Sequence, residues 1–563
     1  MANMRELDVK SMPDLRELFY AATGIYDTCV AFHEKKQGFY QHISYGRLRE
    51  ETEALGTALA RQLSGAPRVL IIGKSGYSWV LAYLAVLCGA GVPVPADEGL
   101  DAEALAELCR EARIGAVLYD TAARERVAAL TDIPTVCFDT FSQLIYEGRV
   151  AIEEGDRSFR HRVIDPVAPA AVFYTSGTTG RAKGVVLSHR NLLATLAALG
   201  KAQPVTEEDI FLSVLPLSHV YECVLGLLLP LSRGASIAFC EGIDSLMRNM
   251  REIHPTAMVT IPYLAEKIYE KFWQVVAEKG NETAVRRAIA VSDPVRPLSA
   301  RQTLKERLLA AARAPFGGAL RYMTVVGGFL PAAVCRGLRQ IGIFAAVGYG
   351  ITECAGLAAI NTLDCYRDGT AGVALSGLTV DIYSKQSDGS GEIRLKGDSV
   401  MLGYDGDEAR TAEALRNDWY YTGDFGRIDA EGYLHVMGRR QNCIERADGT
   451  LICVEELELL ISQSPLVREV AVAGVLNGEG KDYEPAALII PDLAYATEMF
   501  GIDHTGEELE GAVGEWLGEL NQTLPPAAQI TLFALRTTPF PKNAAGRVLR
   551  ATLAEELAAA MQP

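Results

Sequence analysis

The alternation of amphipathic stretches with short apolar runs constrains the fold of this chain more than any other feature of its sequence. From about residue 40 onward, residues with helical periodicity alternate with runs rich in β-branched side chains. The pattern predicts strands and helices over 44–64 (helix), 67–73 (strand), 78–91 (helix), 92–96 (strand) and 114–120 (strand). Strands that alternate with helices are typical of a parallel sheet with helices on its faces. The sequence therefore predicts an α/β fold with parallel-rich sheets flanked by helices.

The last part of the chain has a different pattern. Apolar runs predict short strands over 466–476 and 484–491, and an amphipathic stretch predicts a helix over 505–520. Thr505 and Glu508 have the spacing of a capping box at the start of this helix. We expect a small α+β C-terminal domain over 439–563, following a large N-terminal domain over 1–438.

Charge and composition exclude some classes of function. The 563 residues carry a formal net charge of −17, with 49% hydrophobic and 22% charged residues. These proportions are typical of a globular protein, and the length is too great for one core. An acidic chain without a stripe of Lys and Arg among aromatic residues is unlike a nucleic-acid-binding protein. We therefore expect no nucleic-acid partner.

The sequence also favours a cytoplasmic location. The first residues show no uninterrupted apolar core of the kind a secretory signal needs. The most apolar stretch, Cys223–Leu231, is far shorter than the roughly 20 residues that span a bilayer, so we expect no transmembrane segment. The 11 cysteines are scattered and form no Cys-x-x-Cys pair, which is typical of reduced, mostly buried thiols.

The segment Tyr174–Val185, "YTSGTTGRAKGV", has the composition of an anion-binding loop. It carries three glycines and three hydroxyl side chains: Gly177, Gly180, Gly184, Ser176, Thr178 and Thr179. Glycines let successive backbone N–H groups turn inward around an anion, and Lys183 adds a point charge. An apolar run predicts a strand over 169–174 and helical periodicity predicts a helix over 188–200, which places the loop at a strand end. The order of residues is not that of a Walker A loop, and a flexible surface loop is the alternative interpretation.

This segment resembles the phosphate-binding loop of the adenylate-forming superfamily, which includes acyl-CoA synthetases, luciferases and peptide-synthetase adenylation domains. Further motifs follow in the family's order, at 215–222 ("LPLSHVYE"), 325–331 ("VVGGFLP"), 348–353 ("GYGITE"), 391–397 ("GEIRLKG"), 420–429 ("YYTGDFGRID"), 438–442 ("GRRQN") and 541–547 ("PKNAAGR"). The resemblance covers nearly the whole chain, and it is most similar to the long-chain fatty acyl-CoA synthetases. It implies a small C-terminal domain that is mobile.

The resemblance implies a site for ATP and Mg²⁺. The phosphates would be held by the loop residues Thr175, Ser176, Gly177, Thr178, Thr179, Gly180 and Lys183. Tyr349 and Gly350 would lie at adenine, Thr352 at the α-phosphate, and Glu353 with Thr175 at Mg²⁺. The ribose would be held by Asp424 and Arg439. From the residues alone, Tyr349 also fits core packing, Asp424 a tight turn and Arg439 a surface charge.

The resemblance also implies an acyl site and a CoA channel. Gly327 and Gly328 would line the acyl tunnel, where a missing side chain lets a carboxylate approach the α-phosphate; a close contact between backbone segments would explain two glycines equally well. His219 is the candidate catalytic or gating residue beside the acyl pocket. As a packing or gate residue it fits better than as a general base.

The implied reaction has two steps, acyl-AMP formation and transfer of the acyl group to a thiol. In the family the small domain rotates at a hinge that falls here at Gln441, where Asp or Lys is usual. The catalytic lysine expected after Gly546 is replaced by Arg547. Arginine keeps the charge but has a larger planar head, so the substitution is not conservative at a tight site. Lys542 lies at a position where the family often has lysine in any case.

Three functions are compatible with these features. The first is a fatty acyl-CoA synthetase that uses ATP, Mg²⁺ and CoA on a carboxylic acid of medium or long chain. The second is an acyl-AMP ligase that loads a carrier protein, although the segment between Glu353 and Gly391 leaves little room for the insertion typical of that branch. The third is a nucleotide- or acyl-binding module whose adenylation activity is crippled by Arg547.

Overall fold

The computed structural model describes residues 7–63, 65, 67–175, 182–290, 309–310, 313–476, 482–501, 505–541, 548, 550 and 553–560. The chain divides into two compact units. Unit 1 contains residues 1–380, 395–420 and 432–434, and unit 2 contains residues 381–394, 421–431 and 435–563. The functional division predicted from the sequence, 1–438 and 439–563, stays a prediction.

The largest sheet of unit 1 is mostly parallel. Its spatial order is β15 (Val373–Ala374), β14 (Ala359–Ile360), β13 (Phe344–Tyr349), β12 (Tyr322–Val325), β11 (Ala257–Thr260), β9 (Ile210–Ser213), β10 (Ser236–Phe239), β1 (Val30–Lys36) and β2 (Phe39–Ser44). Neighbouring strands from β13 to β1 are parallel, and the strands beyond them at both edges are antiparallel. The fold class predicted from the sequence is confirmed.

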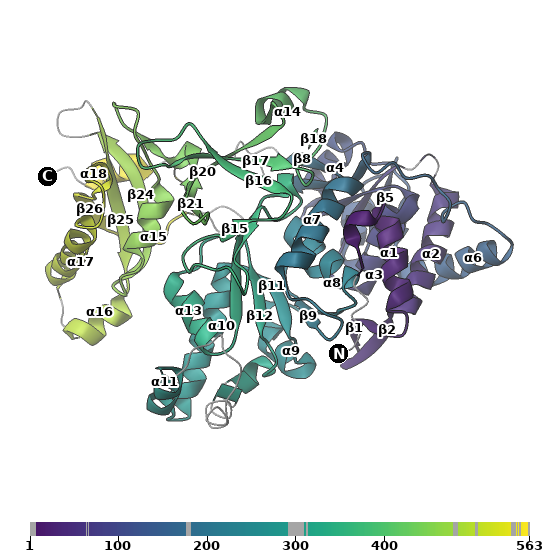
Figure 1. The fold of residues 1–563 in the computed structure, drawn as a ribbon, viewed down its shortest axis with the longest axis horizontal. Coiled ribbons are helices and arrows are strands. Elements are labelled where there is room, and N and C mark those ends of the chain that lie inside the picture. The colour runs from purple at the N-terminus through teal and green to yellow at the C-terminus, as the bar shows by residue number, and fades with distance from the viewer. Residues whose placement is uncertain are drawn as a thin grey trace. The chain divides into compact units, whose positions relative to one another are not determined.

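Helices cover this sheet with apolar side chains. Buried residues of α9 (Leu246–Ile253), α10 (Pro262–Glu278), α11 (Glu282–Ala290) and α13 (Ala332–Gln340) form one core cluster with strand residues such as Met258 and Met323. Figure 1 shows α10 and α13 beside β11 and β12. Because neighbouring strands from β13 to β1 run parallel, their carboxyl ends lie at one edge of the sheet.

A second sheet lies near the start of the chain. It is wholly parallel, in the order β4 (Val92–Ala96), β3 (Arg68–Ile72), β5 (Ala116–Tyr119) and β6 (Thr135–Cys137). The helices and strands predicted for residues 44–120 are confirmed, except that the helix expected over 78–91 is shorter. It is α3 (Tyr77–Ala85), followed by a wider π-helical segment, Val86–Ala90, that contains Gly89 with a φ of +156°.

The other helices of unit 1 complete its layers. They are α1 (Leu15–Ile25), α2 (Tyr45–Gln62), α4 (Ala102–Glu111), α5 (Arg124–Val127), α6 (Phe141–Glu153), α7 (His189–Ala202), α8 (Leu229–Ser232) and α14 (Glu408–Ala414). No helix in the described part of the chain is long and apolar enough to cross a membrane.

A small antiparallel sheet carries the glycine-rich loop. Its order is β18 (Gly403–Tyr404), β8 (Lys183–Ser188) and β7 (Pro169–Thr175). The predicted strand and helix around the loop are present as β7 and α7, but β8 lies between the loop and α7. Arg68 on β3 forms a bidentate ion pair with Asp405 at 2.5 and 2.7 Å, and the hydroxyl of Tyr174 donates to the same carboxylate at 2.9 Å. These contacts hold the base of the loop against the second sheet.

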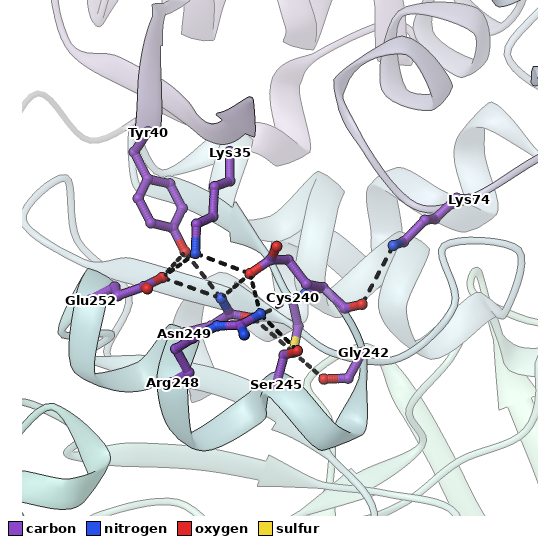
Figure 2. Close-up of polar contacts among 10 residues, drawn as sticks. Lys35, Tyr40, Lys74, Cys240, Gly242, Ser245, Arg248, Asn249 and Glu252 are labelled. Atoms are coloured by element: carbon purple, nitrogen blue, oxygen red, sulfur yellow. Dashed lines mark hydrogen bonds and ion pairs between the residues drawn. The ribbon is translucent and has the colours of Figure 1, made fainter. Parts of the chain in front are cut away.

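A network of polar side chains joins the β1–β2 hairpin to α9 (Figure 2). Lys35 donates to Glu241 at 3.1 Å and to Glu252 at 2.6 Å. Glu241 also accepts from Arg248 at 2.9 Å and from Asn249 at 2.8 Å. The side chains of Glu241 and Glu252 are each about one-third exposed. We call the following residues the surface network: Lys35, Tyr40, Glu241, Arg248, Asn249 and Glu252.

Unit 2 contains the α+β arrangement predicted for the C-terminus, a three-stranded sheet with helices packed on it. Its strands are β24 (Val467–Leu476), β25 (Tyr483–Pro491) and β26 (Leu532–Leu535), with β24 antiparallel and β26 parallel to β25. Alternate residues face opposite sides, so helices pack on both faces: α15 (Val454–Ile461) and α17 (Gly506–Asn521) on one, and α18 (Leu553–Ala560) on the other. The capping box of Thr505 and Glu508 is confirmed at the start of α17. Helix α16 (Leu493–Phe500) follows β25.

The remaining strands form two small sheets. One has the order β16 (Leu378–Tyr383), β17 (Gly391–Gly397), β20 (Trp419–Ile428) and β19 (Leu415–Arg416), with β21 (Leu434–Arg439) paired to β20. The other is a short antiparallel pair of β22 (Ile444–Glu445) and β23 (Leu451–Ile452).

Candidate active site

Three adjacent parallel strands of unit 1 end close together, and two of them end at the predicted acyl and nucleotide motifs. Ile261 follows β11, Gly327 and Gly328 follow β12, and Tyr349 ends β13. A Cβ atom added to Gly328 would lie 3.2 Å from Cγ of Pro262, and Gly327 has a φ of +84° that favours glycine. The parallel strands thus bring distant segments of the sequence to one edge of the sheet, where ligands bind in open α/β folds.

A buried ion pair joins Lys183 to Glu353, which follows the end of β13. Nζ of Lys183, on the strand after the loop, donates to Oε1 of Glu353 at 2.6 Å and to the hydroxyl of Tyr404 at 3.1 Å. The hydroxyl of Tyr404 donates to the same Oε1 at 2.9 Å and lies 3.1 Å from the hydroxyl of Tyr420. The carboxylate of Glu353 is 7% exposed and the Lys183 side chain is 26% exposed. Two predicted residues from separate motifs are therefore in direct contact.

The charge of each partner is maintained by the other. Burial alone would raise the pKa of Glu353, but the charge and hydrogen bond of Lys183 outweigh burial and hold that pKa below its usual value. Burial opposes the charge of Lys183 in the same way, and Glu353 raises the pKa of Lys183 above its usual value. The pair is thus an ammonium and a carboxylate, with the lysine held at the base of the glycine-rich loop.

The segment that carries Glu353 is held by close backbone packing. A Cβ atom at Gly350 would lie 1.7 Å from the carbonyl oxygen of Gly356, so no other residue fits there. The hydroxyl of Tyr221 donates to the carbonyl of Gly350. Tyr349 and Thr352 are buried, at 8% and 7% exposure. The contacts of Tyr221 and of Tyr404 were not found from the sequence, because each depends on pairing between segments far apart in the chain.

Only the two ends of the glycine-rich loop are described. Thr175 and Lys183 are opposite each other in the β7–β8 pairing, so the loop starts and ends beside the Lys183–Glu353 pair. The Oγ1 atom of Thr175 is buried and has no hydrogen-bond partner among the described residues. The predicted phosphate-binding residues between them, Ser176, Gly177, Thr178, Thr179 and Gly180, lie outside the described residues.

His219 lies before the π-helical segment Glu222–Leu228. Its Nδ1 accepts a hydrogen bond from the backbone N–H of Tyr221 at 3.3 Å, and the two rings are 4.7 Å apart between centroids. Burial lowers the pKa of His219, which favours the neutral imidazole. The hydrogen bond to Nδ1 and the ring contact are those of a packed side chain, and the functional role of His219 stays a prediction.

Two further predicted residues form an ion pair within unit 2. Nε of Arg439 lies 2.9 Å from Oδ1 of Asp424, whose carboxylate is 7% exposed. The pair joins β20 to the end of β21. Arg547 and Lys542 lie outside the described residues.

The residues present fit a magnesium ion better than a softer metal. No group of three or more His, Cys, Asp or Glu side chains suited to a metal occurs in the described part of the chain. The carboxylate of Glu353 and the unpartnered hydroxyl of Thr175 are oxygen donors. Mg²⁺ usually takes one or two protein oxygens and completes its shell with phosphate oxygens and water.

Comparisons with known proteins agree with this geometry. A protein-family model described as AMP-binding enzyme matches residues 22–405. Long-chain-fatty-acid–CoA ligase 1 of Homo sapiens is 28% identical over 524 residues, covering 84% of this chain and 73% of that protein. Long-chain-fatty-acid–CoA ligase FadD15 of Mycobacterium tuberculosis is 27% identical over 430 residues, covering 72% of this chain and 71% of that protein.

Solved structures show the same fold. ATP-bound MatB from Rhodopseudomonas palustris superposes with a TM-score of 0.73 at 23% identity, covering 96% of this chain and 99% of that one. The o-succinylbenzoate CoA synthetase MenE from Bacillus subtilis, in complex with the acyl-adenylate OSB-AMP, gives a TM-score of 0.72 at 19% identity, covering 96% and 98%.

Proposed function

The chain belongs to the AMP-binding enzyme family, and on that premise we propose that it is an ATP-dependent acid–CoA ligase. It joins a carboxylic acid to AMP with release of pyrophosphate, and then transfers the acyl group to the thiol of CoA with release of AMP. The observation that carries the proposal is the buried ion pair between Lys183, at the end of the glycine-rich loop, and Glu353, which follows β13.

In the first step, a carboxylate oxygen attacks the α-phosphorus of ATP and pyrophosphate leaves. Such a reaction depends mainly on alignment and on charges placed near the phosphates. Lys183 supplies a positive charge whose position is set by Glu353 and Tyr404. A bound Mg²⁺, held through Glu353 and Thr175, would offset the charge of the phosphate oxygens.

The nucleoside part of ATP has its own proposed contacts. We assign Tyr349 and Gly350 to the adenine and Thr352 to the α-phosphate, since they end the strand and turn that lead to Glu353. Asp424 and Arg439 are assigned to the ribose. The Asp424 side chain lies 2.9 Å from Arg439, and a carboxylate can accept hydrogen bonds from two hydroxyls.

In the second step, the thiol sulfur attacks the acyl carbonyl carbon and AMP leaves. We propose that rotation near Gln441 separates the two steps and that Arg547 serves the first. His219 is proposed as a residue of the CoA or acyl channel, where a neutral ring gates access rather than moves a proton.

We propose a fatty acid of medium or long chain as the acid. The glycines after β12 are bordered by apolar side chains that remain accessible, Ile261 at 37% and Phe329 at 36% exposure. A Cβ atom at Gly327 would be 3.9 Å from Ile261 and 3.8 Å from Tyr221, so there is room beside these side chains. The names of the curated relatives support the same substrate class.

The test is an assay of pyrophosphate and AMP release over a panel of straight-chain acids of increasing length, with and without CoA. We expect pyrophosphate release that depends on the acid, AMP release that CoA accelerates, and an acyl-CoA product identified by mass spectrometry. Acid-dependent pyrophosphate release without a CoA effect would instead support the loading of a carrier protein. ATP binding without any acid-dependent turnover would support a binding module with crippled adenylation.

A further inference from the structure

Two cysteines of unit 2 lie in contact beside the end of β21. The sulfur atoms of Cys443 and Cys453 are 2.9 Å apart. Cys443 is half-buried and Cys453 is 2% exposed. No other pair among the eleven cysteines, all of which the structure describes, makes such a sulfur–sulfur contact.

The backbone places these two residues opposite each other. Ile444 on β22 pairs with Ile452 on β23, so extending the register by one residue sets Cys443 across from Cys453. Opposite residues of an antiparallel pair have Cα atoms about 4.5–5.5 Å apart, within the range of about 4.4–6.8 Å that a disulfide spans. The sulfur separation exceeds an S–S bond of about 2.05 Å by less than 1 Å, so small side-chain rotations suffice to form the bond.

The pair is fixed at one end and accessible at the other. Cys453 is the residue that precedes α15, and its backbone carbonyl accepts the N–H of Leu457 at 3.4 Å. The contact with Cys443 and its burial raise the pKa of Cys453. Cys443 is therefore the sulfur that a dissolved oxidant reaches first.

We propose that Cys443 and Cys453 are a site of reversible disulfide formation that alters the segment carrying Arg439. With a glutathione disulfide as oxidant, the thiolate of Cys443 attacks one of its sulfurs and releases one glutathione thiolate, which takes up a proton. Cys453 then loses its proton and attacks the Cys443 sulfur, releasing the second glutathione. Two protein thiols are oxidised to one disulfide, and one glutathione disulfide is reduced to two thiols.

The bond changes a contact with the proposed ribose site. The Cys443 S–H donates to the backbone carbonyl of Arg439 at 3.5 Å, and the side chain of Arg439 pairs with Asp424. A disulfide sulfur has no proton, so this hydrogen bond is lost on oxidation. The effect on ATP rests on the proposed function, whereas formation of the disulfide does not.

The first arm of the test uses the full chain alone. The protein is equilibrated in glutathione buffers from reducing to oxidising, free thiols are blocked by alkylation, and peptides are mapped by mass spectrometry. We expect a single intramolecular cross-link between 443 and 453 and the loss of two of the eleven alkylated thiols. Cys453→Ser should instead carry one glutathione on Cys443, and Cys365→Ser, which changes a half-buried cysteine elsewhere, should form the cross-link normally. A pair that stays reduced in the most oxidising buffer, or wild-type protein that accumulates only mixed disulfides, overturns the proposal.

The second arm measures ATP affinity of the reduced and oxidised chain by calorimetry. We expect a few-fold weaker binding after oxidation, restored by a thiol reductant and absent in Cys443→Ser, whose hydroxyl can still donate to the Arg439 carbonyl and cannot form a disulfide. An unchanged affinity in a chain whose cross-link is confirmed overturns the coupling to Arg439. If neither form binds ATP, the proposed function fails while the disulfide mapping still decides the cysteine chemistry.

Discussion

In the candidate active site one carboxylate faces one ammonium, whereas in the surface network Lys35 lies between Glu241 and Glu252 (Figure 2). Both regions use hydrogen bonds of 2.6 Å between lysine and glutamate. They differ in what surrounds the pair. Glu353 has 7% of its side chain exposed, and Glu241 has 36%.

The pKa values show how this difference acts. Burial would raise the pKa of Glu353, and the charge and hydrogen bond of Lys183, with smaller contributions from a backbone N–H and the Tyr404 hydroxyl, reverse the effect. The pKa of Glu241 is lowered to about 2 by hydrogen bonds from Asn249, Lys35 and Arg248, with little burial to oppose them. The surface network therefore has several donors that can replace one another, while the buried pair has a single cation that nothing else replaces.

Glu222 shows the state of a buried carboxylate without such a cation. It is fully buried, and neither oxygen has a hydrogen-bond partner of normal geometry among the described residues. Burial raises its pKa to about 8, which contacts with Ser213 and Leu215 offset only in part. Glu353 without Lys183 would face the same penalty.

Breaking the buried pair is expected to have the largest effect. Glu353→Ala should lower the free energy of unfolding by about 3–4 kcal/mol, because it leaves Lys183 partly buried without its counter-charge. Acid-dependent pyrophosphate release should fall by at least about a hundredfold, as when one preorganised charge is removed from a reacting phosphate. Chemical denaturation and the pyrophosphate assay measure the two effects.

Glu353→Gln keeps an oxygen acceptor for Lys183 and Tyr404 and serves as the milder variant. It should recover part of the stability but little of the activity, because the negative charge is gone. Full activity in either variant would remove Glu353 from the site.

The next effect is a pH dependence at Glu222. The unfolded carboxyl titrates near its ordinary pKa of 4.5 and the folded one near 8, so between these values only the folded chain keeps the proton. Stability from this group is complete below about 4.5 and falls as pH rises toward 8. Between about pH 5.5 and about pH 7.5, wild type should lose about 2.7 kcal/mol relative to Glu222→Gln, which follows from about 1.36 kcal/mol per unit.

Denaturation followed by tryptophan fluorescence at several pH values measures this difference. Glu241→Gln is the matched control, since the low pKa of Glu241 puts its own titration below about 4.5. Parallel curves for wild type and Glu222→Gln would mean that Glu222 is ionised in the folded chain.

The fold was largely predictable because its elements have local signals. The apolar runs at β3, β4 and β25 and the capping box of α17 depend on neighbouring residues alone. Strand β8 was not predicted as a strand, although it contains the buried run Val185, Val186 and Leu187. The segment overlaps the glycine-rich loop, and its pairing with β7 is a tertiary contact.

The candidate site was predictable in its residue types but not in its contacts. Lys183 and Glu353 were assigned separately to phosphates and to Mg²⁺, and nothing in the sequence shows that they meet. Tyr404 lies outside the motif residues that were singled out, and it reaches Glu353 only because β18 pairs with β8. The roles of Asp424, Arg439 and Arg547 stay predictions.

A smaller effect is expected at Asp424. Its surroundings are intermediate between those of Glu353 and those of the surface network, because Asp424 is buried but faces a partly exposed arginine. Asp424→Ala should weaken ATP binding by about 2 kcal/mol, roughly thirtyfold, because charge-assisted hydrogen bonds to the ribose are lost. Asp429→Ala is the matched control, since Asp429 directly follows the strand that carries Asp424 and pairs with His435 at 3.0 Å. Calorimetric titration that gives equal ATP affinities for both variants would place the ribose elsewhere.

The smallest effect is expected in the surface network. In Glu241→Gln the amide oxygen still accepts from Asn249 and Arg248, and Lys35 still faces Glu252 at 2.6 Å. The free energy of unfolding should change by less than about 1 kcal/mol at low salt, and the change should shrink further as salt screens the exposed charges. Denaturation at low and high salt measures this, with the pyrophosphate assay expected to be unchanged. If Glu241→Gln destabilises the chain as much as Glu353→Ala, the several donors around Glu241 do not compensate for one another. The β1–β2 hairpin would then depend on this one carboxylate.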